Sequence, residues 1–373
     1  MTTVDANEES DNLHDRVLAM VHAFAMSEPA PEPTDALACD IARFQARNIP
    51  GFARLCARYA VDADKLVNAA DIPAVPTDAF KLTRVFAFAD GEPVVFQTSG
   101  TTVGRRGRHI MRGTDTYDRA ALAFGHRMLM PPTLGIQMPF IPVLVLGPPP
   151  SEQPDSSLTH MLSMFAERMG SDATGQETYF LRDGVFELAR LDERVARMIA
   201  LRDSPVLLLG TSFAFVHFLD AMGADTFQLP TGSRVMQTGG FKGKSREVPA
   251  SELRREIARV FCIEEGDVMS EYGMTELSSQ FYTRAGADAL AGIFSEPPWA
   301  RVTPVVPETL EPVEDGEIGI ARIVDLCNVD SAVAIQTQDL VRREGNGFVL
   351  LGRLPGAAPR GCSIAIDEML GPS

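Results

Sequence analysis

A short run of hydroxyl and glycine residues has the composition needed to bind the phosphates of a nucleotide. The run TSGTT, Thr98 to Thr102, follows the apolar, β-prone segment EPVVF and leads into VGRRGRH, which ends at His109. Gly100 permits backbone conformations in which successive N–H groups converge on an anion. The candidate phosphate ligands are Thr98, Ser99, Gly100, Thr101, Thr102 and Arg105. A surface turn is the alternative, and His109 is expected either to contact phosphate or to be solvated.

A second segment, EYGMTE from Glu271 to Glu276, combines an aromatic ring, a hydroxyl and a carboxylate. Tyr272 can stack on a purine, Thr275 can bond a phosphate oxygen, and Glu276 can hold Mg2+, which prefers carboxylate and phosphate oxygens. The preceding GDVMS is expected to be the strand that delivers them, with Gly273 in the same nucleotide-binding segment. The alternative is the start of a helix with Thr275 as its N-cap.

Together the two segments resemble those of the adenylate-forming enzymes, the superfamily of acyl-CoA synthetases, luciferase and adenylation domains. Within it, EYGMTELSSQFY and RGCS, Arg360 to Ser363, are most similar to the LuxE-type acyl-protein synthetases of bacterial bioluminescence. The resemblance runs from about Pro76 to the last residue. It implies that the TSGTT loop grips the phosphates of ATP and that YGMTE closes over adenine, α-phosphate and metal.

Further matches follow in the expected order. Asp339 in IQTQDLVRR stands where the superfamily has an aspartate that bonds the ribose hydroxyls, and Gly352 with Arg353 matches the Gly-Arg pair that follows it. Taken alone, Asp339 could be a turn residue between two strands. The chain also departs from the usual loop, because Val103 interrupts TSGTTG and arginines replace the usual lysine.

The end of the chain suggests how the acyl group would be accepted. The superfamily carries a mobile domain with an adenylation lysine after the Gly-Arg pair, whereas Leu354 to Ser373 contain no lysine. Lys242 and Lys244 in TGGFKGKS are candidates to replace it. The resemblance implies that Cys362 receives the acyl group from the adenylate as a thioester, a task that suits a nucleophilic thiolate. The alternative is a buried strand cysteine within CSIAI.

Other segments suggest an acyl pocket and rival functions. Gly210, Phe213, Gly239 and Gly240 lie near expected strand ends, where open α/β sheets bind ligands; the alternative for the aromatic residues is core packing. TGGFKGKS is one residue out of register with a P-loop, so a P-loop nucleotidase is disfavoured. No histidine pair has metal-ligand spacing, and no GxSxG elbow is present.

Composition is that of a folded cytoplasmic enzyme. Of 373 residues, 45% are hydrophobic and 23% charged, which argues against disorder. A formal net charge of −16 disfavours binding to nucleic acid or to an anionic membrane. The five cysteines are scattered without a CxxC pair, as expected in a reducing compartment. The most apolar stretch, from Pro205, is broken by polar residues and predicts strand, loop and helix rather than a membrane span.

Periodicity predicts an α/β fold with layered, largely parallel sheets and a small C-terminal β-rich subdomain. Helical spacing covers Asn7 to Met26 and Ala36 to Ala60, separated by the proline-rich EPAPEPTDA. The strand-like runs are VVF, IPVLVLG, PVLLLG, SRVMQ, GDVMS, EIGIARIVD, SAVAIQTQDLVRR, GNGFVLLGR and CSIAI. The expected division is a helical region at 1–75, a nucleotide- and acyl-binding core at 76–303, and the β-rich subdomain at 304–373.

These observations lead to one expected function and two alternatives. We expect ATP-dependent activation of a carboxylic acid, by resemblance a fatty acid, followed by transfer to Cys362 and then to an acyl reductase or another acyl-acceptor protein. The first alternative is a coenzyme A ligase similar to phenylacetate-CoA ligases, or an adenylating enzyme that loads a carrier protein. The second is a non-catalytic nucleotide-binding assembly protein.

Overall fold

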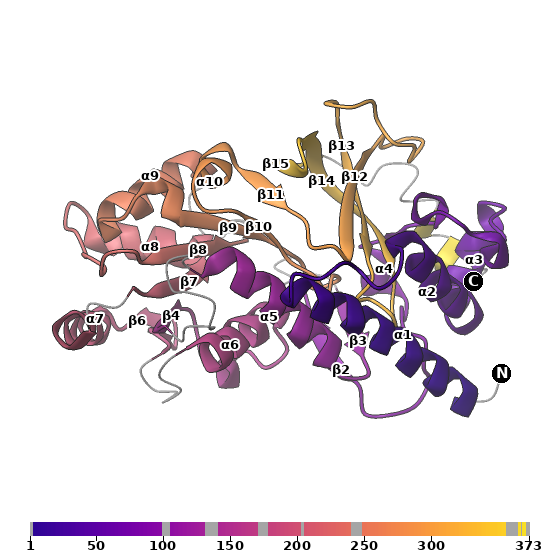
Figure 1. The fold of residues 1–373 in the computed structure, drawn as a ribbon, viewed down its shortest axis with the longest axis horizontal. Coiled ribbons are helices and arrows are strands. Elements are labelled where there is room, and N and C mark those ends of the chain that lie inside the picture. The colour runs from indigo at the N-terminus through magenta and orange to yellow at the C-terminus, as the bar shows by residue number, and fades with distance from the viewer. Residues whose placement is uncertain are drawn as a thin grey trace. The chain divides into compact units, whose positions relative to one another are not determined.

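The computed structural model describes residues 3–98, 105–130, 141–170, 178–202, 205–239, 248–355, 365–366 and 368–370. Its contacts divide the chain into two compact units (Figure 1). Unit 1 comprises Met1–Ala123, Met274–Gln280 and Glu296–Ser373, and unit 2 comprises Phe124–Gly273 and Phe281–Ser295. Both units are therefore discontinuous in sequence. The sequential boundaries after residues 75 and 303 stay predictions.

Unit 1 begins with three helices, α1 (Thr3–Ala25), α2 (Thr34–Asn48) and α3 (Pro50–Arg58). The proline-rich break between α1 and α2 lies where it was predicted. The single helix expected from Ala36 to Ala60 is wrong, because Ile49 is extended and Pro50 starts a new helix. Proline disfavours helical backbone in the residue before it, yet it fits the first turn of a helix, where its missing N–H costs nothing.

The sheet of unit 1 is antiparallel, in the order β12 (Ala300–Val305), β13 (Ile318–Asp325), β14 (Ala334–Glu344) and β15 (Gly347–Arg353). A short strand, β1 (Val75–Pro76), runs parallel to β14, and the one-turn helix α4 (Ala79–Leu82) follows it. A separate hairpin pairs β2 (Val94–Gln97) with β3 (Arg108–Met111). Strand β2 leads into the TSGTT segment, and β14 and β15 carry Asp339 and Arg353.

Unit 2 has a sheet in the order β11 (Ile293–Ser295), β10 (Phe281–Thr283), β9 (Val268–Tyr272), β8 (Arg234–Thr238), β7 (Leu207–Thr211) and β4 (Val143–Leu146). Strands β4, β7, β8 and β9 are parallel, and β10 and β11 are antiparallel. The continuous apolar runs that predicted the four parallel strands are typical of strands covered on both faces. The prediction of a largely parallel α/β sheet is confirmed.

The other elements of unit 2 cover or flank this sheet. A two-stranded hairpin joins β5 (Leu181–Arg182) to β6 (Val185–Phe186). The helices are α6 (Ser157–Met169), α7 (Leu188–Arg202), α8 (Ser212–Met222), α9 (Ala250–Phe261) and α10 (Ala287–Ala291), and α5 (Asp115–Leu129) crosses the boundary at residue 123. Figure 1 shows α8 and α9 beside the parallel strands. The core there combines residues of β7, β8 and β9 with Phe215 and Phe218 of α8 and Phe261 of α9, all buried.

One alternative and one prediction are wrong. Thr275 does not cap a helix, since the chain after β9 forms a turn and an irregular segment before β10. The strand expected at CSIAI is not formed at Ala365 and Ile366, which are helical. Among the described residues, no helix has the length and apolar character needed to cross a membrane.

Candidate functional site

The TSGTT segment leaves the end of strand β2, and the chain returns along β3. Gln97 pairs with Arg108 and Phe96 with His109. Beyond the last pair, the Thr98 N–H donates to the Gly107 carbonyl at 2.9 Å, and the Gly107 N–H donates to Thr98 Oγ1 at 2.9 Å. The hairpin therefore closes the base of the predicted phosphate loop, while Ser99, Gly100, Thr101 and Thr102 lie outside the described residues.

Gly107 shows how closely the two sequence motifs meet. A Cβ at this position would lie 2.9 Å from Thr98 Cγ2 and 3.5 Å from Glu276 Oε1. The Glu276 carboxylate, which is 6% exposed, thus lies against the base of the TSGTT loop. Thr98 of the first motif and Glu276 of the second therefore both lie next to Gly107, and a side chain at this position would crowd Thr98.

The arginines after the loop differ in what they contact. Arg106 Nε donates to the Thr98 carbonyl at 2.7 Å, so this side chain ties the loop base together. Arg105, the predicted phosphate ligand, is exposed. An exposed guanidinium beside the loop can still attract an anion, and that role for Arg105 stays a prediction.

The segment that carries Thr275 and Glu276 is held by side chains rather than by a sheet. His109 Nδ1 lies 2.7 Å from the Thr275 carbonyl oxygen, and Asn328 Nδ2 donates to the Glu276 carbonyl at 3.0 Å. Both peptide carbonyls that flank the Glu276 α-carbon therefore have partners. An irregular buried segment needs such partners, because its polar backbone groups have no neighbouring strand to pair with.

Asp325, at the end of β13, anchors the next part of this segment. Its carboxylate accepts hydrogen bonds from the Ser278 N–H at 2.9 Å, the Ser279 N–H at 2.8 Å and Ser279 Oγ at 2.6 Å. The Cys327 N–H donates to it at 3.0 Å. Burial raises the pKa of Asp325, although the hydrogen bonds from Ser279, Ser278 and Cys327 oppose that rise. Sequence analysis missed this residue.

His109 is a correction to both roles expected for it. It is 1% exposed rather than solvated, and its two ring nitrogens contact protein atoms, with Nε2 2.9 Å from Ser331 Oγ. Burial lowers the pKa of His109 to about 4, so the ring is neutral at pH 7. An uncharged ring with both nitrogens engaged is not a phosphate ligand.

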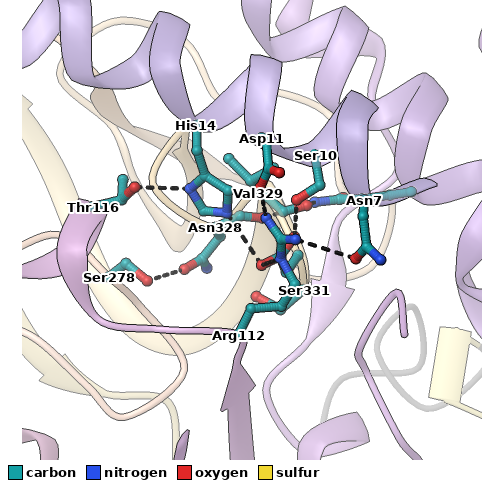
Figure 2. A network of polar contacts seen from close by, with 12 residues as sticks. Asn7, Ser10, Asp11, His14, Arg112, Thr116, Ser278, Asn328, Val329 and Ser331 are labelled. Carbon is teal, nitrogen blue, oxygen red and sulfur yellow. Dashed lines mark hydrogen bonds and ion pairs between the residues drawn. The ribbon is translucent and has the colours of Figure 1, made fainter. Parts of the chain in front are cut away.

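The loop after β13 also contacts the N-terminal helix (Figure 2). Ser10 Oγ of α1 donates to Asp330 at 2.6 Å, and His14 Nε2 lies 3.1 Å from the other oxygen of that carboxylate. Arg112 forms ion pairs with Asp330 at 3.4 Å and with Asp11. Burial favours the neutral acid, but His14, Ser10 and Arg112 hold the pKa of Asp330 below its usual value. Helix α1 thus supports the loop that contains Asn328 and Ser331.

Asp339 and Arg353, the predicted ribose-site residues, are directly opposite each other on β14 and β15. Opposed residues of antiparallel strands have neighbouring side chains, so an acidic and a basic group lie together at this point. Asp339 is half-buried and Arg353 is exposed. Asp339 is thus in a regular strand rather than in a turn.

Tyr272, at the end of β9 in unit 2, packs among aromatic residues. Its ring is 7% exposed and lies 6.0 Å from the ring of Phe281 and 6.1 Å from that of Phe294. Gly273, which follows it, is half-buried. Stacking of Tyr272 on a purine stays a prediction.

Polar side chains gather at the carboxyl ends of β7, β8 and β9. Ser212 Oγ hydrogen-bonds Gln237, whose Nε2 donates to Ser270 Oγ at 2.7 Å. Thr238 and Glu271 are opposite each other in the ladder and are hydrogen-bonded. Burial raises the pKa of Glu271 to about 7, against the opposing effect of the Thr238 hydroxyl. This polar edge was not foreseen, because the sequence shows only single polar residues at the ends of apolar runs.

The predicted acyl-pocket residues have different surroundings. A Cβ at Gly210 would lie 3.0 Å from Phe215 and 3.2 Å from Leu146, so close packing of strand and helix requires glycine there. Phe213 is half-buried, with its ring 4.4 Å from that of His217. Gly239 has a φ of 78° and open space on its Cβ side, and its carbonyl accepts from Ser212 Oγ at 2.7 Å. Their roles in binding an acid stay predictions.

Several predicted residues lie outside the described part of the chain. They are Ser99, Gly100, Thr101, Thr102, Gly240, Lys242, Lys244 and Cys362. Among the residues that the structure does describe, no group of three or more His, Cys, Asp and Glu side chains is placed to hold a metal ion. A protein-only metal cage is thus not found there, whereas Glu276 could supply one carboxylate to an ion that phosphate oxygens also bind.

Solved structures with a similar fold include a 2-hydroxyisobutyryl-CoA ligase. A 2-hydroxyisobutyryl-CoA ligase in its postadenylation state matches with a TM-score of 0.56 and 14% identity, over 86% of this chain and 68% of that chain. The same ligase in an open conformation, with an acyl-adenylate and coenzyme A, matches with a TM-score of 0.54 and 14% identity, over 86% and 69%. ATP-bound MatB from Rhodopseudomonas palustris matches at 0.48 and 16% identity. That match covers 72% of this chain and 50% of MatB, so the chain spans about half the length of MatB.

At these identities the likeness shows the fold alone, which is the α/β fold of adenylate-forming ligases. No curated protein matches the sequence significantly. The family model of acyl-protein synthetase, LuxE, matches residues 10–371. That match includes EYGMTE, Asp339 and Cys362 together with the N-terminal helices. The chain therefore belongs to the LuxE acyl-protein synthetase family.

Proposed function

We propose that this protein uses ATP to activate a carboxylic acid as an acyl-adenylate and then transfers the acyl group to Cys362. The observation that supports the first half is the proximity of the two predicted nucleotide-binding motifs on either side of Gly107. The Glu276 carboxylate lies 3.5 Å from the position that a Gly107 Cβ would take, beside Thr98 at the base of the TSGTT loop. A buried carboxylate next to a predicted phosphate loop is the arrangement that a metal-bound triphosphate needs.

In the first step a carboxylate oxygen of the acid attacks the α-phosphorus of ATP. The bond from this phosphorus to the bridging oxygen breaks, pyrophosphate leaves, and the acyl-adenylate forms. The hydroxyls of Thr98 and its neighbours would stabilise the charge on the phosphate oxygens, and Thr275 would bond one of them. Glu276 would hold Mg2+, which supplies charge neutralisation when bound. We assign the nucleoside to Tyr272 and Asp339, with Arg353 beside the latter.

In the second step the Cys362 thiolate attacks the acyl carbon, the bond from that carbon to the phosphate oxygen breaks, and AMP leaves. The product is a thioester on the protein, which a reductase or another acyl-acceptor protein would consume. Support for this step is family membership and the RGCS segment. Support for a fatty acid is likewise the family, while Phe213, Gly210, Gly239 and Gly240 remain the candidate pocket residues.

The test is to incubate the protein with Mg-ATP and a panel of fatty and aromatic acids, and to measure both pyrophosphate release and intact mass. We expect pyrophosphate with at least one acid, together with an acyl adduct that hydroxylamine removes and that maps to Cys362. Glu276→Gln should abolish pyrophosphate release, whereas Cys362→Ala should retain it and lose the adduct.

The other outcomes separate the alternatives. A Cys362→Ala protein that still carries the adduct would contradict the acceptor assignment. When coenzyme A is added to the same mixture, free acyl-coenzyme A formed by that variant would instead make the protein a coenzyme A ligase. Absence of pyrophosphate with every acid would favour a nucleotide-binding role without catalysis.

A further inference from the structure

His109 connects three parts of unit 1 that are distant in sequence. It belongs to β3, the second strand of the hairpin that closes the TSGTT loop at Thr98 and Gly107. Its ring contacts the Thr275 carbonyl, 166 positions away, and the Ser331 hydroxyl, 222 positions away. Phe80 of α4 packs edge-on against the ring at 5.7 Å. The ring is therefore held on several sides, with little freedom to rotate.

The two partners decide where the ring proton is. A carbonyl oxygen only accepts hydrogen bonds, so Nδ1 must carry the proton and donate to Thr275. Nε2 is then the acceptor, and the Ser331 hydroxyl donates to it. Burial supports this neutral form, since it lowers the pKa of the ring to about 4. The Thr275 carbonyl thus selects the tautomer with the proton on Nδ1, and the Ser331 hydroxyl matches it by donating to Nε2.

The bond to Thr275 acts on the residue that follows. The Thr275 carbonyl belongs to the peptide plane that joins Thr275 to Glu276, and Asn328 holds the next carbonyl, that of Glu276 itself, at 3.0 Å. With both planes fixed, the direction of the bond from Cα to Cβ of Glu276 is fixed too. The hairpin of the phosphate loop and the carboxylate of Glu276 are thereby linked through one imidazole.

We propose that His109 is a positioning residue for ATP activation, whose Nδ1–H bond to Thr275 holds Glu276 in place relative to the base of the TSGTT loop. The inference rests on the proposed function for its catalytic readout. It goes beyond that function because both ring nitrogens of His109 bond protein atoms, so the ring acts through Thr275 and Glu276. The hydrogen bond, rather than the bulk of the ring, performs this role.

Three substitutions at His109 test the effect of the hydrogen bond separately from the effect of the ring volume. His109→Asn places an amide nitrogen where Nδ1 lies and keeps a donor for Thr275. His109→Gln places its amide further out, where Nε2 lies, and serves Ser331 instead. His109→Leu removes both bonds and keeps most of the apolar volume. Phe44→Leu, a fully buried change in α2 of the same unit, controls for lost stability.

We would measure pyrophosphate release with the best acid, and amide hydrogen exchange of peptides that cover residues 268–281. In His109→Leu, kcat should fall roughly 10- to 100-fold, as expected when a partly buried carbonyl loses its donor, with KM for the acid unchanged. His109→Asn should recover most of the activity and His109→Gln should not. Exchange should rise in 268–281 in the Leu and Gln variants, and Phe44→Leu should leave kcat and this exchange unchanged.

The two readouts separate failure of this inference from failure of the proposed function. An active wild-type protein whose kcat is unchanged in His109→Leu would overturn the positioning role, and so would equal losses in the Asn and Gln variants. If no acid yields pyrophosphate from the wild type, the proposed function fails, and the exchange experiment still decides whether His109 orders this segment. Unchanged exchange in His109→Leu would then overturn the inference.

Discussion

The buried carboxyl of Glu271 makes a prediction about the stability of unit 2. Burial raises its pKa from 4.5 to about 7 in the folded protein. Between these values the folded state holds a proton that the unfolded chain has released, so the free energy of unfolding falls as pH rises through this window. The total loss is about 3 kcal/mol, at about 1.4 kcal/mol for each pH unit. Glu271→Gln mimics the protonated acid and retains an acceptor for Thr238, so this loss should vanish.

The measurement is urea unfolding followed by circular dichroism at 222 nm, from pH 5.5 to pH 8.5, where the chain is strongly anionic. At pH 5.5 wild-type protein has already lost about 1.4 kcal/mol, so the advantage of Glu271→Gln should grow by about 2 kcal/mol across this range. Glu252→Gln, an exposed change in α9 of the same unit, is the charge-matched control and should show no such growth. A stability difference that stays constant with pH would refute a buried, protonated Glu271.

Two further predictions concern unit 1. Gly107→Ala should lower pyrophosphate release more than tenfold. The alanine Cβ would lie 2.9 Å from Thr98 Cγ2 and push the loop base away from Glu276. Unaltered release would show that the close packing of Thr98 on Gly107 is unimportant. Asp325→Asn should lower the free energy of unfolding by about 2 to 3 kcal/mol, since an amide cannot accept all four hydrogen bonds that the carboxylate accepts. Fluorescence of Trp299, the single tryptophan and a buried residue of unit 1, measures that loss, and an unchanged midpoint would contradict the anchoring role.

Sequence patterns predicted the regular elements well where burial alone determines them. The runs VLVL, LLLG, RVMQ and VMS each contain consecutive apolar residues, and they became β4, β7, β8 and β9. The pattern failed at Pro50, where helical spacing continues through a residue that splits the helix. Periodicity reports which face of an element is buried, and it does not register a one-residue interruption.

The sequence indicated the motifs of the candidate site, and it did not indicate the residues that hydrogen-bond the segment around Glu276. Thr98, Thr275 and Glu276 stand out because their residue types suit phosphate and metal. Asp325 and Asn328 do not, since their function depends on contacts 46 to 52 positions away. The available signal was the set of polar residues in DLCNVDS, which begins with the last residue of a buried strand. Its meaning required knowledge of which segment packs against it.

The discontinuity of unit 1 has a consequence for folding during synthesis on the ribosome. Met274–Gln280 belongs to unit 1 but lies in the sequence between the two segments of unit 2. The side chains that hydrogen-bond it, Asp325 and Asn328, are synthesised about fifty residues later. Until those residues emerge, the backbone groups around Glu276 have no partners from β13 and the loop after it, and closing that loop costs chain entropy. A nascent chain that already contains both sequence motifs therefore still lacks the partners that hold the segment around Glu276, and these are present only once Asn328 has been made.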